Sequence, residues 1–151
     1  MSKITPFLWY NGQIKEAADL YTSVFPNAKV ISTSPGPEGA LMSATLEIEG
    51  QRLIIFNGGP GHQLSPAASL YVDCESQAEV DRLWAQLSEG GAESRCGWLI
   101  DRFGLSWQII PSILPKLLQD PDRAKANRAM KAMLGMAKID IAALEKAVNG
   151  G

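Results

Sequence analysis

The fold of this chain depends most on the stretch Cys96-Gly-Trp-Leu-Ile-Asp-Arg-Phe-Gly-Leu-Ser-Trp-Gln-Ile-Ile-Pro111. It predicts two short strands joined by a turn at residues 101–104, because Asp favours the first turn position and Gly104 tolerates a positive φ at the fourth. Residues 105–110 are short and apolar, as is typical of a buried strand. Gln108 falls in the middle of that strand, where a polar group needs a hydrogen-bond partner. Gln108 is therefore either a satisfied core amide or one wall of a binding cavity.

The residues just before this stretch predict a strand and a helix. Residues 68–72 form a β-prone run, and Ser76-Gln-Ala-Glu79 is a capping-box signature for the start of a helix. Gly90-Gly91 marks the end of that helix. Its apolar stripe, at helical spacing, consists of Val80, Leu83, Trp84 and Leu87.

The first part of the chain predicts the same elements in the same order. Its patterns indicate a strand, a helix that ends before Pro26, and three further strands. The expected strands are residues 4–10, 29–34, 41–48 and 52–57, and the expected helix is 14–25.

Sliding one part over the other indicates an internal duplication. Leu20-Tyr21 falls on Leu83-Trp84 at an offset of 63 residues, and Gly50 falls on Gly104 at an offset of 54. Two copies of one unit are the simplest account of this similarity. The sequence therefore predicts an α+β protein built from two βαβββ modules.

The predicted domain organisation is a paired βαβββ domain at 1–111, with module one at 1–58 and module two at 67–111. A helical appendage follows at 112–151, where the composition shifts to helix formers. Asp120-Pro121 predicts a helix start, with the acid as N-cap and proline at the first helical position, and Asp140 predicts the cap of a last helix. The methionine-rich face of this appendage is typical of core or dimer contacts, since Met fills irregular apolar gaps.

Composition excludes several classes of partner. The net charge is −2 and the pI is near 5.4, with no basic cluster, which argues against nucleic acid and anionic membranes. No apolar run approaches the roughly 18 residues of a membrane span. The two cysteines, Cys74 and Cys96, and an N-terminus without signal-peptide features predict a cytoplasmic protein with reduced thiols. A small-molecule ligand is the partner that fits this composition best.

Four stretches carry a resemblance to a known superfamily. They are the opening stretch, Phe7-Leu-Trp-Tyr-Asn-Gly12, Leu20-Tyr-Thr-Ser-Val-Phe-Pro-Asn27 and Phe56-Asn-Gly-Gly-Pro60. With the duplicated pattern, they resemble the vicinal oxygen chelate superfamily, which includes glyoxalase I and the bleomycin-resistance proteins. The PhnB-like branch, labelled 3-demethylubiquinone-9 3-methyltransferase, is the most similar, and the resemblance extends to the tail at 139–145. It implies two curved half-barrel modules that enclose a ligand site, commonly in a homodimer.

The resemblance also implies where a metal site would lie. Metal-dependent members place His, Gln or Glu ligands on the first and last strands of each module. In those regions this chain has residues 5–7, 54–56 and 68–69 together with Gln108, and only Gln108 matches in kind. One neutral amide cannot hold a divalent ion that takes several His or carboxylate ligands, and His62 is the only histidine. We therefore expect neither a metal nor another cofactor.

Five residues are candidates for contact with a ligand: Trp9, Asn57, His62, Trp98 and Gln108. Alternatives exist for several of them, since His62 fits an exposed loop and each tryptophan fits a plain core position equally well. An indole offers a large contact area and one N–H donor. Strand alternation places Trp107 on the face opposite Gln108.

Two other motifs resemble functional sites, and the sequence around each disfavours that role. The glycines of Gly58-Gly-Pro-Gly61 do not fit an S-adenosylmethionine or phosphate cradle, because the next element is a strand and not a helix. Cys96 fits a small buried thiol better than a nucleophile, because no His or Lys is near it in sequence.

The sequence thus predicts a metal-independent small-molecule binding protein with an apolar, aromatic-lined cavity. The alternative is an enzyme of the same superfamily, either a quinone-ring methyltransferase or a glyoxalase-like lyase or isomerase. A third hypothesis is that the protein serves mainly as a part of a larger assembly.

Overall fold

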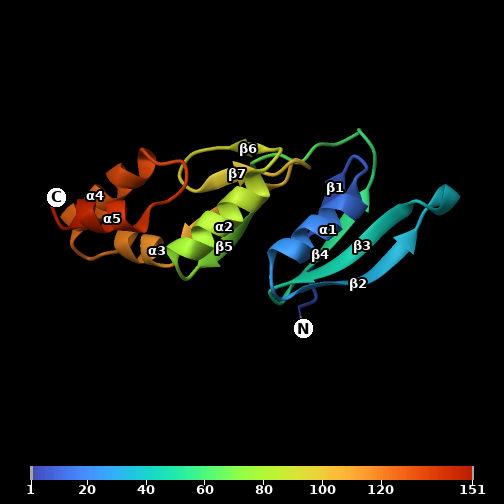
Figure 1. Ribbon diagram of the computed structural model, residues 1–151, viewed down its shortest axis with the longest axis horizontal. Coiled ribbons are helices and arrows are strands. Elements are labelled where there is room, and N and C mark those ends of the chain that lie inside the picture. Colours follow the sequence, from blue (N-terminus) through green and yellow to red (C-terminus); the bar gives the residue numbers. More distant parts are fainter. Residues whose placement is uncertain (1, 151) are drawn as a thin grey trace. The chain divides into compact units, whose positions relative to one another are not determined.

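The computed structural model describes residues 2–150 and divides the chain into two compact units, Met1–Ser65 and Pro66–Gly151. Each unit contains one four-stranded mixed sheet (Figure 1).

The first unit is a βαβββ module. Its elements are β1 (Phe7–Tyr10), α1 (Ile14–Val24), β2 (Ala28–Pro35), the short 3-10 helix η1 (Pro37–Gly39), β3 (Leu41–Ile48) and β4 (Gln51–Asn57). The strand order is β1-β4-β3-β2. The β1 and β4 strands are parallel and the other pairs are antiparallel.

The second unit repeats this arrangement and adds three helices. The repeat consists of β5 (Ser69–Cys74), α2 (Gln77–Ser88), β6 (Ala92–Glu93), β7 (Trp98–Ile100) and β8 (Ser106–Pro111). The order β5-β8-β7-β6, with β5 and β8 parallel, is that of the first sheet. The predicted pair of βαβββ modules is therefore confirmed. The added helices are α3 (Ile113–Leu118), α4 (Arg123–Leu134) and α5 (Ile141–Val148).

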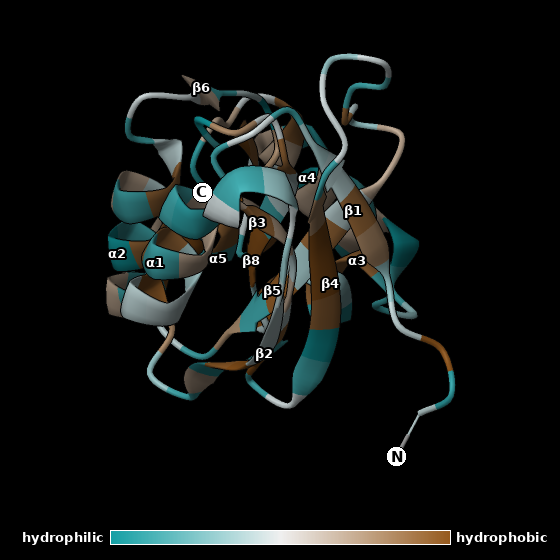
Figure 2. Ribbon diagram, turned by 90° about the vertical axis from the view of Figure 1, so that its right-hand side faces the viewer, coloured by the Kyte–Doolittle hydropathy of each residue, from teal (hydrophilic) through white to brown (hydrophobic). Residues whose placement is uncertain are grey.

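Strand alternation gives each sheet one buried face and one face of mixed character. On β4 the side chains of Leu53 and Ile55 are buried, whereas the neighbouring Ile54 is only half-buried. On β8 Trp107 and Ile109 are buried, and Gln108 between them is half-buried. Hydrophobic colour runs along β4 and hydrophilic colour along α1 and α2, as expected for helices that bury one side only (Figure 2).

The turn between β7 and β8 is built on a buried acid. Asp101 is 2% exposed, and its backbone carbonyl accepts a hydrogen bond from the Gly104 N–H at 3.0 Å, as the predicted turn requires. Its Oδ1 accepts from the N–H groups of Phe103 and Leu105 at 2.9 and 3.0 Å, and its Oδ2 accepts from Trp107 Nε1 at 2.9 Å. These three donors offset the cost of burying a carboxylate. Asp101 therefore holds the hairpin and the Trp107 indole in one arrangement.

The predicted start of α2 is confirmed at its cap. Ser76 Oγ accepts from the Glu79 N–H at 3.2 Å, as in a capping box. The return bond differs, because Glu79 Oε1 accepts from the N–H of Glu75 rather than from that of Ser76.

The predicted start of α4 at Asp120-Pro121 is wrong by two residues. The N-cap is Asp122, whose Oδ1 accepts from the N–H groups of Ala124 and Lys125 at 3.0 and 3.4 Å. Asp120 Oδ1 accepts instead from the Asp122 N–H at 2.8 Å, and so folds the turn before the helix. Asp140 caps α5 as predicted, since its Oδ1 accepts from the Ala143 N–H at 3.1 Å.

The C-terminal helices pack on the second module through a hydrophobic cluster. Its buried members are Ile110 of β8, Leu114 of α3, Leu144 of α5 and Ile139, which lies just before α5. Partly buried side chains surround them: Leu117, Leu118, Ala132, Met133 and Met136. The predicted core role of the methionine face thus applies to Met133, whereas Met130 is 41% exposed.

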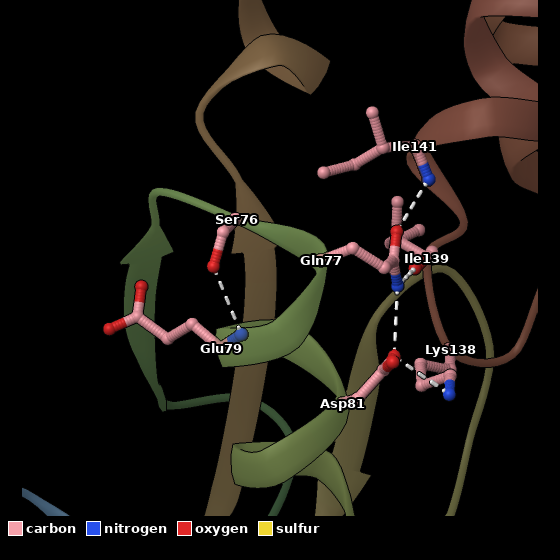
Figure 3. A network of polar contacts seen from close by, with 7 residues as sticks. All are labelled: Ser76, Gln77, Glu79, Asp81, Lys138, Ile139 and Ile141. Atoms are coloured by element: carbon pink, nitrogen blue, oxygen red, sulfur yellow. Dashed lines mark hydrogen bonds and ion pairs between the residues drawn. The ribbon is translucent and has the colours of Figure 1, made fainter.

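Polar contacts fix the same helices to the module. The backbone N–H groups of Cys96 and Gly97 donate to the carbonyls of Met136 and Ala137, each at 2.8 Å. The Gln77 side chain donates to the Ile139 carbonyl at 3.0 Å and accepts from the Ile141 N–H at 2.8 Å (Figure 3). In the same network Lys138 Nζ lies 2.8 Å from Asp81 Oδ1. We call residues 136–141 the docking segment.

Among residues 2–150, no helix combines the length and the apolar character that a membrane crossing needs.

Candidate functional site

In the first unit, Trp9 is the centre of an aromatic cluster. Its ring centroid lies 5.1 Å from that of Phe56 and 4.8 Å from that of His62, both edge to face. The indole N–H donates to the Gly59 carbonyl at 2.9 Å. Residues 58–62 therefore fold onto the Trp9 ring, and His62, although exposed, has an aromatic neighbour.

The glycine at position 58 serves this contact. A Cβ atom at Gly58 would lie 2.2 Å from the Trp9 ring, which no structure tolerates without a shift. The glycine-rich loop thus packs against an indole, and the expectation that it is no cradle for a phosphate or for S-adenosylmethionine stays a prediction.

Asn57 ends β4 and holds a turn. Its Oδ1 accepts from the Gly12 N–H at 2.6 Å, and Gly12 has a φ of 73°. Because this oxygen is engaged, Asn57 positions the turn after β1, and direct contact with a ligand stays a prediction for this residue.

In the second unit, Gln108 is flanked by two aromatic side chains. It lies opposite Tyr71 of β5 and opposite Trp98 of β7 in the strand register. Directly opposed residues point to the same face of a sheet, so the three side chains form one row. The structure therefore brings Trp98 and Gln108 together.

A cavity of about 220 Å³ lies over this row. The sheet contributes Tyr71, Trp98, Gln108 and Ile110, and Cys96 adds its thiol. The other wall comes from the C-terminal helices, through Leu114, Pro115, Leu118 and Met133. The cavity thus belongs entirely to the second unit.

The lining of this cavity contains no Asp, Glu, Lys, Arg or His side chain. Its polar groups are the Gln108 amide, the Tyr71 phenol, the Trp98 indole N–H and the Cys96 thiol. The pKa of Tyr71 is raised, mainly by partial burial and to a smaller extent by the nearby Asp73 and Cys74. The phenol is therefore neutral at neutral pH. Gln108 Nε2 donates to Ser69 Oγ at 3.0 Å. Since the Ser69 hydroxyl can also donate, the amide can present either an acceptor or a donor to a ligand.

The two thiols differ in their surroundings. Cys74 is fully buried, and burial, then the Glu79 and Asp73 carboxylates, raise its pKa to about 12. Cys96 is half-buried and lines the cavity. Both are free cysteines. A thiol reagent should therefore reach Cys96 and not Cys74.

The residues present do not fit a divalent metal ion. Within residues 2–150, no three side chains of the His, Cys, Asp and Glu types gather as ion ligands would. Gln108 has the Ser69 hydroxyl beside it and no carboxylate or histidine in the cavity lining. No chemical step through a metal is derived for this site.

Several residues of the cavity were not predicted from the sequence. Tyr71 belongs to it because of its register with Gln108, and that register could have been inferred once β5 and β8 were paired as parallel strands. Leu118 and Met133 belong to it because the tail packs back onto the sheet, for which the sequence contains no local signal.

Two βαβββ modules with this strand order are the fold of the vicinal oxygen chelate class of proteins. A sequence profile of the family described as 3-demethylubiquinone-9 3-methyltransferase matches residues 2–110, and the chain belongs to that family. The match ends before the tail, where the resemblance was expected to continue. Comparison with curated proteins finds no match.

Solved structures agree with this assignment. The PhnB protein from Bacillus cereus, which carries the same methyltransferase description, is 32% identical, and the match covers 73% of this chain and 99% of that one with a TM-score of 0.69. A protein from Pseudomonas aeruginosa is 25% identical over 74% of this chain and 98% of its own, with a TM-score of 0.62. The fosfomycin resistance protein FosX from Listeria monocytogenes, solved with Mn(II) and sulfate, shares the fold at 16% identity, covering 71% and 89%, with a TM-score of 0.53.

Proposed function

We propose that this protein binds a small neutral molecule, without a metal ion, in the cavity of its second unit. The observation that carries the proposal is the row formed by Tyr71, Gln108 and Trp98 beneath an otherwise apolar wall. Concave apolar sites with a few convergent polar groups are the usual form of small-molecule sites. The absence of charged side chains from the lining disfavours a charged ligand, because a buried charge needs a partner.

Ligand-observed NMR with phenol as the probe tests this proposal. The Gln108→Leu variant should weaken phenol binding several-fold, because the hydrogen bond to the amide contributes roughly 1 kcal/mol. Gln119→Leu, at an exposed position outside the cavity lining, is the matched control and should bind as the unchanged protein does. If Gln108→Leu binds phenol unchanged, Gln108 is only a core amide.

In the first unit, Trp9, His62 and Asn57 are proposed as a second group of contact residues. The edge-to-face pair of Trp9 and His62 offers an apolar ring face beside a polar edge. A Trp9→Phe variant would keep the ring contact with Phe56 and lose the donor to Gly59. Unchanged binding in Trp9→Phe and in His62→Ala together would remove these residues from the proposal.

Catalysis is the alternative function, and the family description favours methyl transfer. S-adenosylmethionine should then raise the melting temperature by mass action, and no shift at millimolar concentration would leave that activity without support. A lyase or isomerase of the glyoxalase type would need a divalent ion. Metal analysis of the purified protein tests it, since a stoichiometric, tightly held ion would overturn the metal-independent proposal.

A cytoplasmic location and a homodimer complete the proposal. The free Cys74 and Cys96 fit a reducing compartment, and relatives of this class commonly pair. Sedimentation equilibrium measures the oligomeric state directly, and a monomer at all concentrations would contradict the homodimer.

A further inference from the structure

The C-terminal helices supply one wall of the cavity from outside the matched family segment. The family profile ends at residue 110, and α3 begins at Ile113. The match to the Bacillus cereus protein covers almost all of that chain and only 73% of this one. Four lining residues, Leu114, Pro115, Leu118 and Met133, come from this additional segment. This wall of the cavity is therefore formed by residues outside the segment that matches the family.

These wall residues differ in how firmly they are held. Leu114 is 2% exposed and packs in the buried cluster with Ile139 and Leu144. Leu118 and Met133 are half-buried and only border that cluster. The docking segment fixes the helices on the other side, through Gln77 and the paired backbone at residues 96–97 and 136–137. Leu118 and Met133 thus line the cavity from helices whose backbone is fixed to the module.

The volume of the cavity limits the size of its occupant. An apolar cavity of about 150 Å³ is enough to bind benzene. Sites for drug-sized ligands run from roughly 300 to 1,000 Å³. At about 220 Å³, this cavity lies between these two sizes, which favours a single ring with a short substituent over a drug-sized ligand.

Resting on the proposed function, we infer that the ligand is a neutral single-ring molecule with one hydroxyl or carbonyl group, and that Leu118 and Met133 set this size limit. The ring lies between Trp98 and the helical wall. Its polar group meets the Gln108 amide, which can donate or accept because Ser69 Oγ can do the same. A carboxylate is disfavoured, since no lining side chain carries a positive charge.

Cys96 provides a reporter of occupancy. Its thiol lines the cavity, whereas Cys74 is fully buried with a pKa of about 12, so alkylation by iodoacetamide measures Cys96 alone. The probes are 4-methylphenol as the neutral single ring, 2-naphthol as the larger ring system, and 4-methylbenzoate as the charged single ring. We expect 4-methylphenol to slow alkylation at concentrations at which the other two do not. Ligand-observed NMR gives the same ranking independently of the thiol.

Variants of the helical wall test the size limit. Leu118→Ala should increase the affinity for 2-naphthol at least tenfold and change that for 4-methylphenol by less than threefold. Met133→Ala is a second variant with the same expected direction, in case the first does not fold. Leu134→Ala, a neighbour of Met133 that is 56% exposed and outside the lining, is the matched control and should leave the ranking unchanged.

The outcomes separate the two proposals. If 4-methylphenol binds and neither wall variant admits 2-naphthol, the size limit is wrong while the proposed binding site stands. If 4-methylbenzoate binds as well as 4-methylphenol, the neutral ligand class is wrong. If no ring compound binds the unchanged protein, the proposed function at this cavity fails and the inference fails with it.

Discussion

The two modules have the same strand order, but the second faces of their sheets have different surroundings. In the first unit, α1 packs on the face of Leu53 and Ile55, and the other face presents the Trp9 cluster with Phe7 56% exposed. In the second unit, α2 packs on the equivalent face and the C-terminal helices pack over the other one. A duplicated fold thus yields an aromatic face in one copy and, in the other, a cavity walled by that unit's own C-terminal helices. In the second unit the sheet supplies the polar side chains of the cavity, and the C-terminal helices that cover the sheet enclose its volume.

The hairpins of the two modules offer the strongest contrast. In the second unit, Asp101 is buried with three donors, whereas in the first the β3–β4 turn has Glu49, an exposed residue that accepts from the Asn27 N–H at 2.8 Å. Asp101→Ala should lower the free energy of unfolding by about 3 kcal/mol or more, because hydrogen bonds to charged groups contribute about 1.5–3 kcal/mol each. Glu49→Ala should cost less than about 1 kcal/mol. Urea denaturation measures both, and equal losses would remove the contrast.

The aromatic face of the first unit depends on one glycine. Gly58→Ala should lower the free energy of unfolding by about 1–3 kcal/mol, the range for overpacking, because the new methyl group would strike the Trp9 ring. Gly61→Ala is the control, since a Cβ at that position would lie 4.0 Å from the same ring. The same denaturation measurement applies. A Gly58→Ala variant as stable as Gly61→Ala would mean that the Trp9 ring moves aside freely.

Much of this arrangement could be predicted from local sequence patterns. The alternation around Gln108 and the Asp101 to Gly104 turn placed β7 and β8 correctly, because turn chemistry and strand period are local properties. The duplication then predicted the pair of βαβββ modules, whereas the strand order within each sheet came from the structure. The helix start at Asp120 was wrong because Asp120 and Asp122 both suit a cap, and the hydrogen bond from the Asp122 N–H to Asp120 decides between them.

The second wall of the cavity could not be predicted in this way. The pattern of α4 shows that Met133 lies on an apolar face, but not which surface that face meets. That surface is fixed by contacts distant in sequence, such as those of Gln77 with Ile139 and Ile141. For the same reason Asp101 was read only as a turn former, because its bond to Trp107 requires the folded hairpin.

The role of Gln77 as the connection between module and tail can be measured. Gln77→Ala removes two hydrogen bonds to the docking segment and should lower the free energy needed for local opening there by about 1 kcal/mol. Faster amide exchange at Ile141, whose N–H donates to Gln77, is the expected signal. Gln86→Ala, at an exposed position on the same helix, is the control. Unchanged exchange at Ile141 would assign the docking of the tail to its apolar cluster alone.

The smallest expected effect is the pH dependence of the Lys138–Asp81 pair, which joins α2 to the docking segment. Hydrogen bonds from Lys138 and then Gln77 hold the pKa of Asp81 below its usual value. Because the folded pKa lies below the unfolded one, the pair stabilises the protein above the unfolded pKa of about 4 and loses this contribution as the pH falls through the folded value. Near neutral pH the unchanged protein should therefore be slightly more stable than Lys138→Ala, and this difference should shrink in acid. High salt should weaken it as well, because both side chains are substantially exposed.

The control for this measurement is Lys131→Ala, which removes an exposed lysine of α4 and should show no such trend in chemical denaturation across pH. A difference that does not vary with pH would mean that Lys138 acts on the docking segment through packing and not through its charge.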